Sequence, residues 1–197
     1  MKKISMIALT LSSLLFISGC ASHAPHDTAA TRAATPTETP AMVGAVMVDM
    51  KNSKGESVGS AWVAPAKEGD KGVIVQLDLH GLPAGTHGIH LHEKGSCVAP
   101  DFKSAGGHFS PVKHDHGTMS KNGPHAGDLG NIEIATNGTL QTRIENDHVD
   151  LGVSMKSLQQ GAGTSLIIHA KADDNKSQPA GNSGDRIACG EIHALTK

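Results

Sequence analysis

The feature that most constrains the fold of this chain is a series of short strand-like runs separated by turn residues. Asn137-Gly138 is typical of a tight hairpin, and residues 51–55, 67–71 and 81–85 provide further turns. No run keeps a helical period over ten or more residues. Many short strands at this spacing predict an all-β domain, either a sandwich or a barrel. The eight expected strands are Val43–Met50, Val58–Ala64, Gly72–His80, Thr86–His92, Asn131–Ala135, Leu140–Asn146, Ser165–His169 and Arg186–His193.

Two long stretches interrupt this pattern of strands, Lys94–Gly130 and Ala170–Asp185. Long loops without secondary structure of their own usually carry function in a compact domain. We therefore expect the strands to form the scaffold and the two loops to form the functional site.

The N-terminal residues have the character of an export signal. Lys2 and Lys3 precede an apolar stretch over residues 4–17, which is too short for a membrane-spanning helix. The stretch ends in Ile17-Ser18-Gly19-Cys20, which resembles the lipobox of bacterial lipoproteins, where the cysteine is lipidated and becomes the mature N-terminus. We expect a signal peptide over residues 1–19 and lipidation of Cys20; the alternative is an ordinary cleaved signal with an incidental cysteine. Both predict an exported, periplasmic protein, and Ala21 after the cysteine favours an anchor in the outer membrane.

A polar segment separates this signal from the strands. Residues 20–41 are rich in Ala, Thr and Pro and cannot bury enough apolar surface to offset the entropy of ordering them, so we expect a flexible tether. His23 and His26 lie within it, either as solvated residues or as aids to metal capture. Residues 42–197 then form one domain. The net charge of −2 with neutral histidine gives no indication of a nucleic-acid partner.

Histidines dominate the candidate functional residues. In a strand, alternate side chains share a face, so His90 and His92 project to the same side, about 6–7 Å apart, where two imidazoles can close on one metal ion. More potential ligands follow in the two long loops and at the end of the strand Ser165–His169. With that pair they make six histidines and one carboxylate, enough for two metal ions: His90, His92, His108, His116, His125, His169 and Asp128.

These residues stand in motifs that resemble those of the copper,zinc superoxide dismutase family. The match begins near Val43 and follows the family's order through Gly88–Glu93, Ala105–Phe109, Gly123–Leu129, Ile168–Asp174 and Gly181–Gly190. The resemblance implies superoxide dismutase activity with one copper and one zinc ion per subunit. It also implies an eight-stranded, flattened Greek-key β-barrel, an architecture that this family shares with immunoglobulin domains.

The resemblance also assigns a role to each ligand. It implies that copper is bound by His90, His92, His108 and His169, and zinc by His108, His116, His125 and Asp128. His108 appears in both sets because the family uses one deprotonated imidazole as a bridge between the metals, and this bridge takes and returns a proton during the reaction. Asp173 matches an outer carboxylate that links a copper histidine to a zinc histidine, here His90 and His116, and fixes the orientation of both rings.

The remaining histidines receive structural roles or none. His87 matches a family histidine that hydrogen-bonds the backbone. His114 lies two residues before His116 and could be mistaken for the zinc ligand, but the family's spacing favours His116. His80, His148 and His193 match no site.

The chain has three cysteines, an odd number for an oxidising compartment. With Cys20 lipidated, Cys97 and Cys189 remain, and the matching positions in the family form an intrachain disulfide, which an exported chain can keep. Cys97 and His108 are eleven residues apart, an insertion that resembles exported bacterial members more than cytosolic eukaryotic ones.

The resemblance places Arg186 beside the copper as a permanent positive charge that docks the superoxide anion. Lys103 and Lys176 are candidates for steering the anion, and the alternative is that both are solvated surface lysines. A non-enzymatic metal-binding protein on the same barrel is the main rival function. We expect such a relative to lack a copper ligand or Arg186, and all of these are present. No feature favours an adhesive or antibacterial surface lipoprotein, and the choice between monomer and homodimer stays open.

Overall fold

The protein was analysed as a computed structural model that describes residues 44–66 and 72–193. Several expectations lie outside the described residues: the signal peptide 1–19, Cys20, the tether 20–41 and the turn 67–71. In the part of the chain that is described, no helix has the length and hydropathy needed to cross a membrane. The strands are β1 (Val46–Asn52), β2 (Ser57–Pro65), β3 (Val73–Leu79), β4 (Gly85–His92), β5 (Asp128–Ile134), β6 (Leu140–Asn146), β7 (Thr164–His169) and β8 (Arg186–Ile192).

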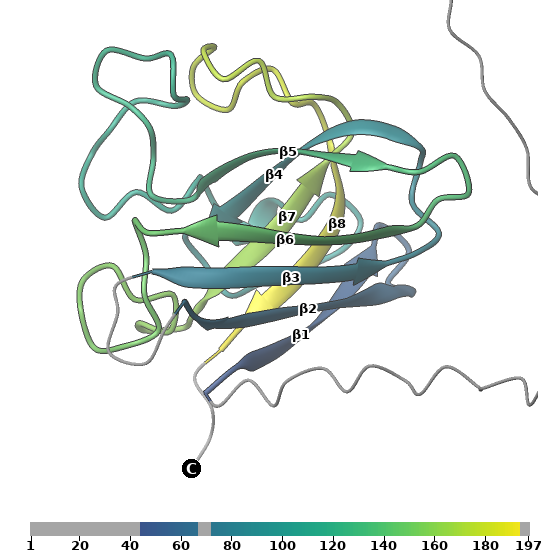
Figure 1. Cartoon of the computed structure of the whole chain (residues 1–197), viewed down its shortest axis with the longest axis horizontal. Coiled ribbons are helices and arrows are strands. Elements are labelled where there is room, and N and C mark those ends of the chain that lie inside the picture. The colour runs from purple at the N-terminus through teal and green to yellow at the C-terminus, as the bar shows by residue number, and fades with distance from the viewer. Residues whose placement is uncertain (1–43, 67–71, 194–197) are drawn as a thin grey trace, which may run out of the picture. The chain divides into compact units, whose positions relative to one another are not determined.

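The eight strands form one antiparallel sheet in the order β5-β4-β7-β8-β1-β2-β3-β6. β7 returns to lie beside β4 after the chain has passed through β5 and β6, which is a Greek-key connection. In Figure 1, β3 and β6 cross in front of β7 and β8 while β1 lies beside β8, so that the sheet curls into a flattened, nearly closed barrel. The predicted fold class is confirmed.

Each predicted strand is present, but some ends differ from the expectation. β5 begins at Asp128, three residues before the predicted Asn131, because a bulge between Gly88 and His90 restores pairing of His90 with Asp128. The hairpin at Asn137-Gly138 joins β5 to β6 as expected, with Gly138 at φ 77° and its N–H donated to Ala135. A third long connection, residues 147–163, joins β6 to β7 and was not singled out from the sequence.

The core is aliphatic, and strand alternation decides which side chains enter it. Ile89 and Leu91 of β4 are fully buried in the main core, so His90 and His92 project from the opposite face of the same strand. β7 alternates in the same way, with Leu166 and Ile168 facing the main core. A smaller cluster covers the other face, formed by Phe102, Ala105, Ile167 and Cys189 with Cys97 against it.

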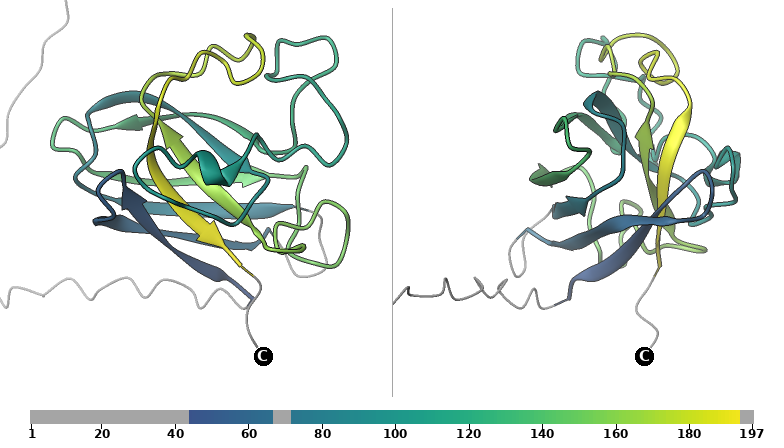
Figure 2. Two further views of the ribbon diagram at one scale, coloured as in Figure 1. Left: turned by 180° about the vertical axis from the view of Figure 1, so that it is seen from behind. Right: turned by 90° about the vertical axis from the view of Figure 1, so that its right-hand side faces the viewer.

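The two predicted functional loops are the ones that cover this outer face. The connection from β4 to β5, residues 93–127, includes one short 3-10 helix, η1 (Lys103–Ala105). The connection from β7 to β8, residues 170–185, rises beside it in Figure 1 and again in both views of Figure 2. The strands therefore act as a scaffold that brings the two loops together over one face of β4 and β7.

Candidate metal centre

Four imidazoles meet where β4 and β7 are covered by the two loops. His90 and His92 come from β4, His169 from the end of β7 and His108 from the loop that follows β4. One ring nitrogen of each lies within 4.8 Å of the corresponding atom of the other three. The structure thus brings together all four residues that the resemblance assigned to copper.

Four nitrogens of this cluster have no hydrogen-bond partner although they are buried. They are His90 Nδ1, His92 Nε2, His108 Nε2 and His169 Nε2. A buried polar atom without a partner costs free energy, and such atoms are uncommon in native proteins. Four of them at one point are the donor set that a metal ion would satisfy, because imidazole nitrogen suits both copper and zinc.

In three of these four imidazoles, the ring nitrogen that is not left unpaired forms a hydrogen bond that fixes the ring. His92 Nδ1 donates to Gly106 O at 3.0 Å, and His169 Nδ1 donates to Gly184 O at 3.1 Å. His90 Nε2 donates to Asp173 Oδ2 at 2.8 Å. These hydrogen bonds fix the tautomers so that the unpaired nitrogens are free to accept a metal.

A second cluster centres on the carboxylate of Asp128. Its Oδ1 lies 2.8, 3.1 and 3.3 Å from the Nδ1 atoms of His108, His116 and His125. A four-coordinate ion with bonds of about 2.0–2.1 Å has ligand atoms roughly 3.3 Å apart, so these separations fit a zinc ion. Asp128 Oδ2 is held by the backbone N–H of Gly117 at 2.9 Å and of His125 at 3.0 Å.

One set of four residues that includes Asp128 has all its ligand atoms within 4.8 Å of one another, and it differs from the expected zinc set by one residue. His90, rather than His125, falls within 4.8 Å of His108, His116 and Asp128 simultaneously. His90 already donates its Nε2 to Asp173, and its Nδ1 is one of the four unpaired nitrogens of the first cluster. His125 has its Nδ1 3.3 Å from Asp128 Oδ1.

The carboxylate of Asp173 lies between the two clusters. Its Oδ2 accepts from His90 Nε2 at 2.8 Å and its Oδ1 from His116 Nε2 at 2.9 Å, and all three side chains are fully buried. Burial acts to lower the pKa of His116, but hydrogen bonds to Asp128 and Asp173 outweigh it and raise this pKa to about 9. Burial acts to raise the pKa of Asp128, and its three histidine partners outweigh it and lower this pKa.

Three imidazoles of the first cluster, those of His92, His108 and His169, are held neutral by their surroundings. Burial lowers the pKa of His92 to about 2 and that of His169 to about 3. Burial also lowers the pKa of His108 to about 4, against the opposing effect of Asp128. A neutral imidazole keeps the lone pair that a metal ion needs, so near neutral pH these three rings can bind a metal without first losing protons.

Arg186 is tied to the same loop that orients His92. Its Nη1 donates to Phe102 O and its Nη2 to Gly106 O, each at 2.7 Å, and Gly106 O is also the acceptor for His92. Gly106 has φ 75°, and a Cβ there would collide with Glu93, so this loop requires glycine. Burial lowers the pKa of Arg186 and the charge of Asp101 opposes the shift; the guanidinium stays charged at neutral pH.

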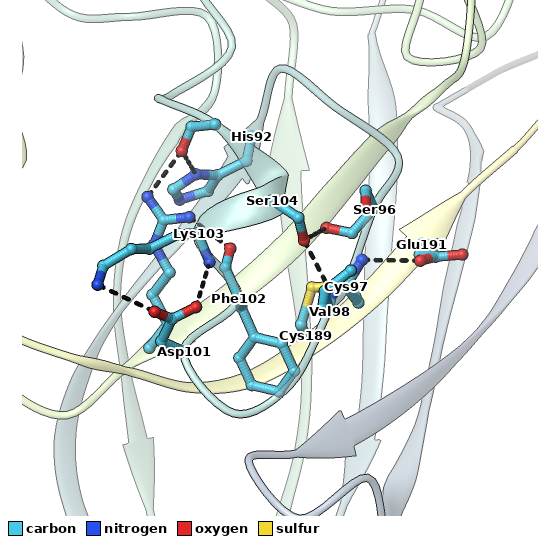
Figure 3. Close-up of a disulfide and its surroundings, with 12 residues drawn as sticks. His92, Ser96, Cys97, Val98, Asp101, Phe102, Lys103, Ser104, Cys189 and Glu191 are labelled. Carbon is cyan, nitrogen blue, oxygen red and sulfur yellow. Dashed lines mark hydrogen bonds and ion pairs between the residues drawn. A yellow bond between two sulfur atoms is a disulfide. The ribbon is translucent and has the colours of Figure 1, made fainter.

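An open cavity of about 620 Å³ is lined in part by Pro100, Asp101, Lys103, Asp185 and Arg186. Lys103 is one of the two lysines considered for steering, and its Nζ pairs with Asp101 Oδ2 at 2.9 Å (Figure 3). Its positive charge therefore lies beside a negative charge at the cavity. Lys176 is exposed and is not part of the lining.

The disulfide between Cys97 and Cys189 is present, as the resemblance implied, and it joins this loop to β8. Figure 3 shows hydrogen bonds that support it: Cys97 N–H donates to Glu191 at 2.7 Å and Val98 N–H donates to Ser104 at 2.8 Å. The cross-link lies beside the segment that carries Phe102 O and Gly106 O, and so beside the two acceptors of Arg186.

The remaining histidines lie where the sequence placed them. His87 is buried and its ring nitrogens contact two backbone oxygens, His169 O at 2.7 Å and Pro83 O at 3.0 Å. His114 is exposed and donates its Nδ1 to Pro124 O at 2.9 Å, away from Asp128. His80, His148 and His193 are exposed and belong to neither cluster.

Comparison with known proteins agrees with this geometry: residues 57–192 match the family described as copper/zinc superoxide dismutase. The chain belongs to the copper/zinc superoxide dismutase family. It is 44% identical over 146 residues to Superoxide dismutase (Cu-Zn) 1 of Aquifex aeolicus, a match that covers 73% of this chain and 85% of that one.

Two solved structures of the family share the fold. A SOD-like protein from Bacillus subtilis superposes with a TM-score of 0.71 at 37% identity, over 74% of this chain and 97% of that chain. The Cu/Zn superoxide dismutase from Brucella abortus superposes with a TM-score of 0.62 at 26% identity, over 76% of this chain and 99% of that chain. Copper and zinc are thus the cofactors of this superoxide dismutase family member, and its two clusters offer nitrogen and oxygen donors suited to both.

Two residues that hold the dismutase centre in place were missed by sequence reasoning. Asn131 of β5 clamps the backbone of Asp173: its Nδ2 donates to Asp173 O at 2.9 Å and its Oδ1 accepts from Asp173 N–H at 2.7 Å. Gln178 makes a similar pair of contacts with His116. Neither residue stands in a pattern of charge or spacing that marks it, since each acts on a segment distant in the chain.

Proposed function

We propose that this superoxide dismutase binds its copper ion through His90, His92, His108 and His169, and its zinc ion through His108, His116, His125 and Asp128. The observation that carries the proposal is the convergence of four buried, unpaired imidazole nitrogens. The reaction converts two superoxide anions and two protons into one dioxygen and one hydrogen peroxide. When bound, copper supplies the one-electron redox chemistry for both half-reactions, while zinc, which has none, supports the site.

Arg186 binds and orients the substrate in this proposal. Superoxide is a small anion, the guanidinium is a permanent cation, and Arg186 lines the open cavity. Because Arg186 and His92 share Gly106 O as an acceptor, an anion held by the guanidinium is placed beside the His92 imidazole. The two carbonyl acceptors hold the guanidinium rigidly, so little orientation is lost when substrate arrives.

His108 accepts and donates a proton in this proposal. It belongs to both ligand sets, with Nδ1 on the Asp128 side and an unpaired Nε2 on the other side. We propose that Nε2 would hold a proton in the half of the cycle in which it is not bonded to the metal, and would give this proton to the peroxide product in the other half. Asp173 and Asp128 keep the flanking rings fixed meanwhile.

We further propose that the enzyme is exported and anchored by lipid at Cys20, in the outer membrane, with residues 20–41 as the tether. The signal-like segment 1–19 and the lipobox-like residues support this proposal. The Cys97–Cys189 disulfide supports export, because such bonds persist in oxidising compartments.

The assignment of the two metals is tested by comparing two ligand variants. His169→Ala removes a ligand of copper alone and should abolish most copper binding and nearly all activity. Asp128→Asn removes a ligand charge from zinc alone and should lower zinc content and thermal stability while leaving copper bound and activity partial. His80→Ala, an exposed histidine outside both clusters, is the control.

Metal content by elemental analysis and the rate of superoxide removal are measured for each variant. Equal loss of copper from both variants would show that the two sites are assigned wrongly. A wild-type protein with full copper and zinc but no acceleration of superoxide decay would favour the rival function, a non-enzymatic metal-binding protein on the same barrel.

A further inference from the structure

A side chain from the 170–185 loop satisfies both backbone polar atoms of His116. Gln178 Oε1 accepts the His116 N–H at 2.8 Å, and Gln178 Nε2 donates to His116 O at 3.0 Å. His116 is fully buried, whereas Gln178 is largely exposed, so the amide reaches inward from the surface to a buried backbone. The two residues are far apart in sequence and belong to different loops.

The same amide holds a second point of the loop that carries His116. Gln178 Nε2 also contacts Ser120 Oγ at 3.0 Å and Lys176 O at 3.3 Å. Ser120 Oγ in turn donates to His116 O. A single glutamine therefore sets the position of His116 relative to the turn that follows it.

The two loops are packed too closely for Gln178 to be an incidental neighbour. A Cβ at Gly117, whose φ is 86°, would collide with the carbonyl of Asn175, and Met119 N–H donates to Asn175 O at 3.1 Å. On the other side of His116, a Cβ at Gly181 would overlap the Asp173 carboxylate. The two loops lie side by side in Figures 1 and 2, and His116 is fully buried.

We propose that Gln178 is a positioning residue that fixes the backbone of His116 and thereby sets the geometry of the zinc site. The inference rests on the proposed assignment of His116 to zinc. The His116 ring is oriented by Asp128 at 3.1 Å and Asp173 at 2.9 Å, and its backbone by the two hydrogen bonds from Gln178. Ring and backbone are thus fixed independently, and the metal meets a ligand that is already in place.

When the Gln178 amide is removed, the entropy loss of ordering the His116 backbone has to be met when zinc binds, and zinc affinity falls. Without Gln178, the His116 N–H loses its partner and His116 O keeps only Ser120 Oγ, so the segment around them must be ordered when zinc binds. Outer residues that orient metal ligands typically change affinity by about 10–100-fold when they are replaced. We expect a loss of zinc affinity at the lower end of that range, because Asp128 and Asp173 still hold the ring.

The test uses Gln178→Met, which keeps the length of the side chain and removes its hydrogen-bonding groups. The matched control is Gln141→Met on β6, where an exposed glutamine bonds Asp78 at 3.2 Å, outside both clusters. Zinc affinity is measured by competition with a chelator on the full-length protein. The ligand geometry is measured from the visible spectrum of Co²⁺ bound in place of zinc. We expect about tenfold weaker zinc binding and an altered Co²⁺ spectrum for Gln178→Met, and wild-type values for the control.

The metal-free protein separates positioning from general stability. Gln178 is exposed and its replacement removes no core packing, so the melting temperature of the metal-free variant should fall only by the few degrees that the lost hydrogen bonds to His116 account for. A lower melting temperature with wild-type zinc affinity and Co²⁺ spectrum would overturn the inference. Ser120→Ala provides a smaller change at the same contact and should weaken zinc binding less; wild-type affinity in both variants would also overturn it. Normal zinc binding by Asp128→Asn would instead show that the assignment of the zinc ligands is wrong, which is distinct from a failure of the role of Gln178.

Discussion

Replacing Cys97 by serine tests how the cross-link between the loop and β8 contributes to stability and to the site. The disulfide closes a loop of 92 residues. In the chain-entropy description, closing a loop of this length lowers the entropy of the unfolded chain by an amount worth about 4–5 kcal/mol at 25 °C. For a domain of this size, each kcal/mol changes the melting temperature by about 2–4 °C, so Cys97→Ser should lower it by roughly 8–20 °C.

The position of Cys97 makes this loss attributable to the cross-link. Cys97 is only partly buried, whereas Cys189 is fully buried against Phe102, Ala105 and Ile167. The free thiol left at Cys189 still packs as a small apolar group. Val98→Ser, at a neighbouring residue whose side chain is 63% exposed, is the matched control and should change stability by less than about 0.5 kcal/mol.

A second effect of the same change should appear in the rate. The cross-linked loop provides Phe102 O and Gly106 O, the two acceptors that hold Arg186. A looser loop should lower activity per bound copper even at 25 °C, where the variant is still folded. Thermal unfolding followed by circular dichroism and activity at matched copper content measure the two effects. A melting temperature within about 3 °C of wild type would refute the entropy argument, and unchanged activity per copper would refute the link to Arg186.

The remaining predictions concern the substrate anion and the anchor. Arg186→Ala should keep both metals and lower the rate by about tenfold or more, which corresponds to ~1.4 kcal/mol in the barrier; a wild-type rate would remove the docking role. At low salt, Asp101→Asn should raise the rate and Lys103→Gln lower it, because each uncovers the charge of its partner beside the cavity. Both effects should shrink as salt screens the charges, and a Lys176→Gln change should be smaller; rates indifferent to salt in all variants would end the steering hypothesis. Cys20→Ser should release active protein from the membrane fraction, and membrane retention unchanged in this variant would contradict lipid anchoring.

Much of the centre follows from local sequence alone. Alternation along a strand is a local property, so the sequence Ile89-His90-Leu91-His92 by itself places two imidazoles on the face opposite two core residues. The spacing of the loop ligands and the family motifs then assign the remaining members of both clusters. The strands were found for the same reason, because turn residues and short apolar runs are visible without knowledge of their partners.

Only the tertiary structure decided how the two loops hold these ligands. Gln178 acts on His116 from 62 residues away, and Arg186 reaches the carbonyl oxygens of Phe102 and Gly106 across 84 and 80 residues. Backbone carbonyls and exposed amides carry no signal in sequence that marks such a use, because every residue has a carbonyl and most glutamines are simply solvated. Their role arises when barrel topology places the β4–β5 loop against the β7–β8 loop, and that juxtaposition is a property of the folded chain.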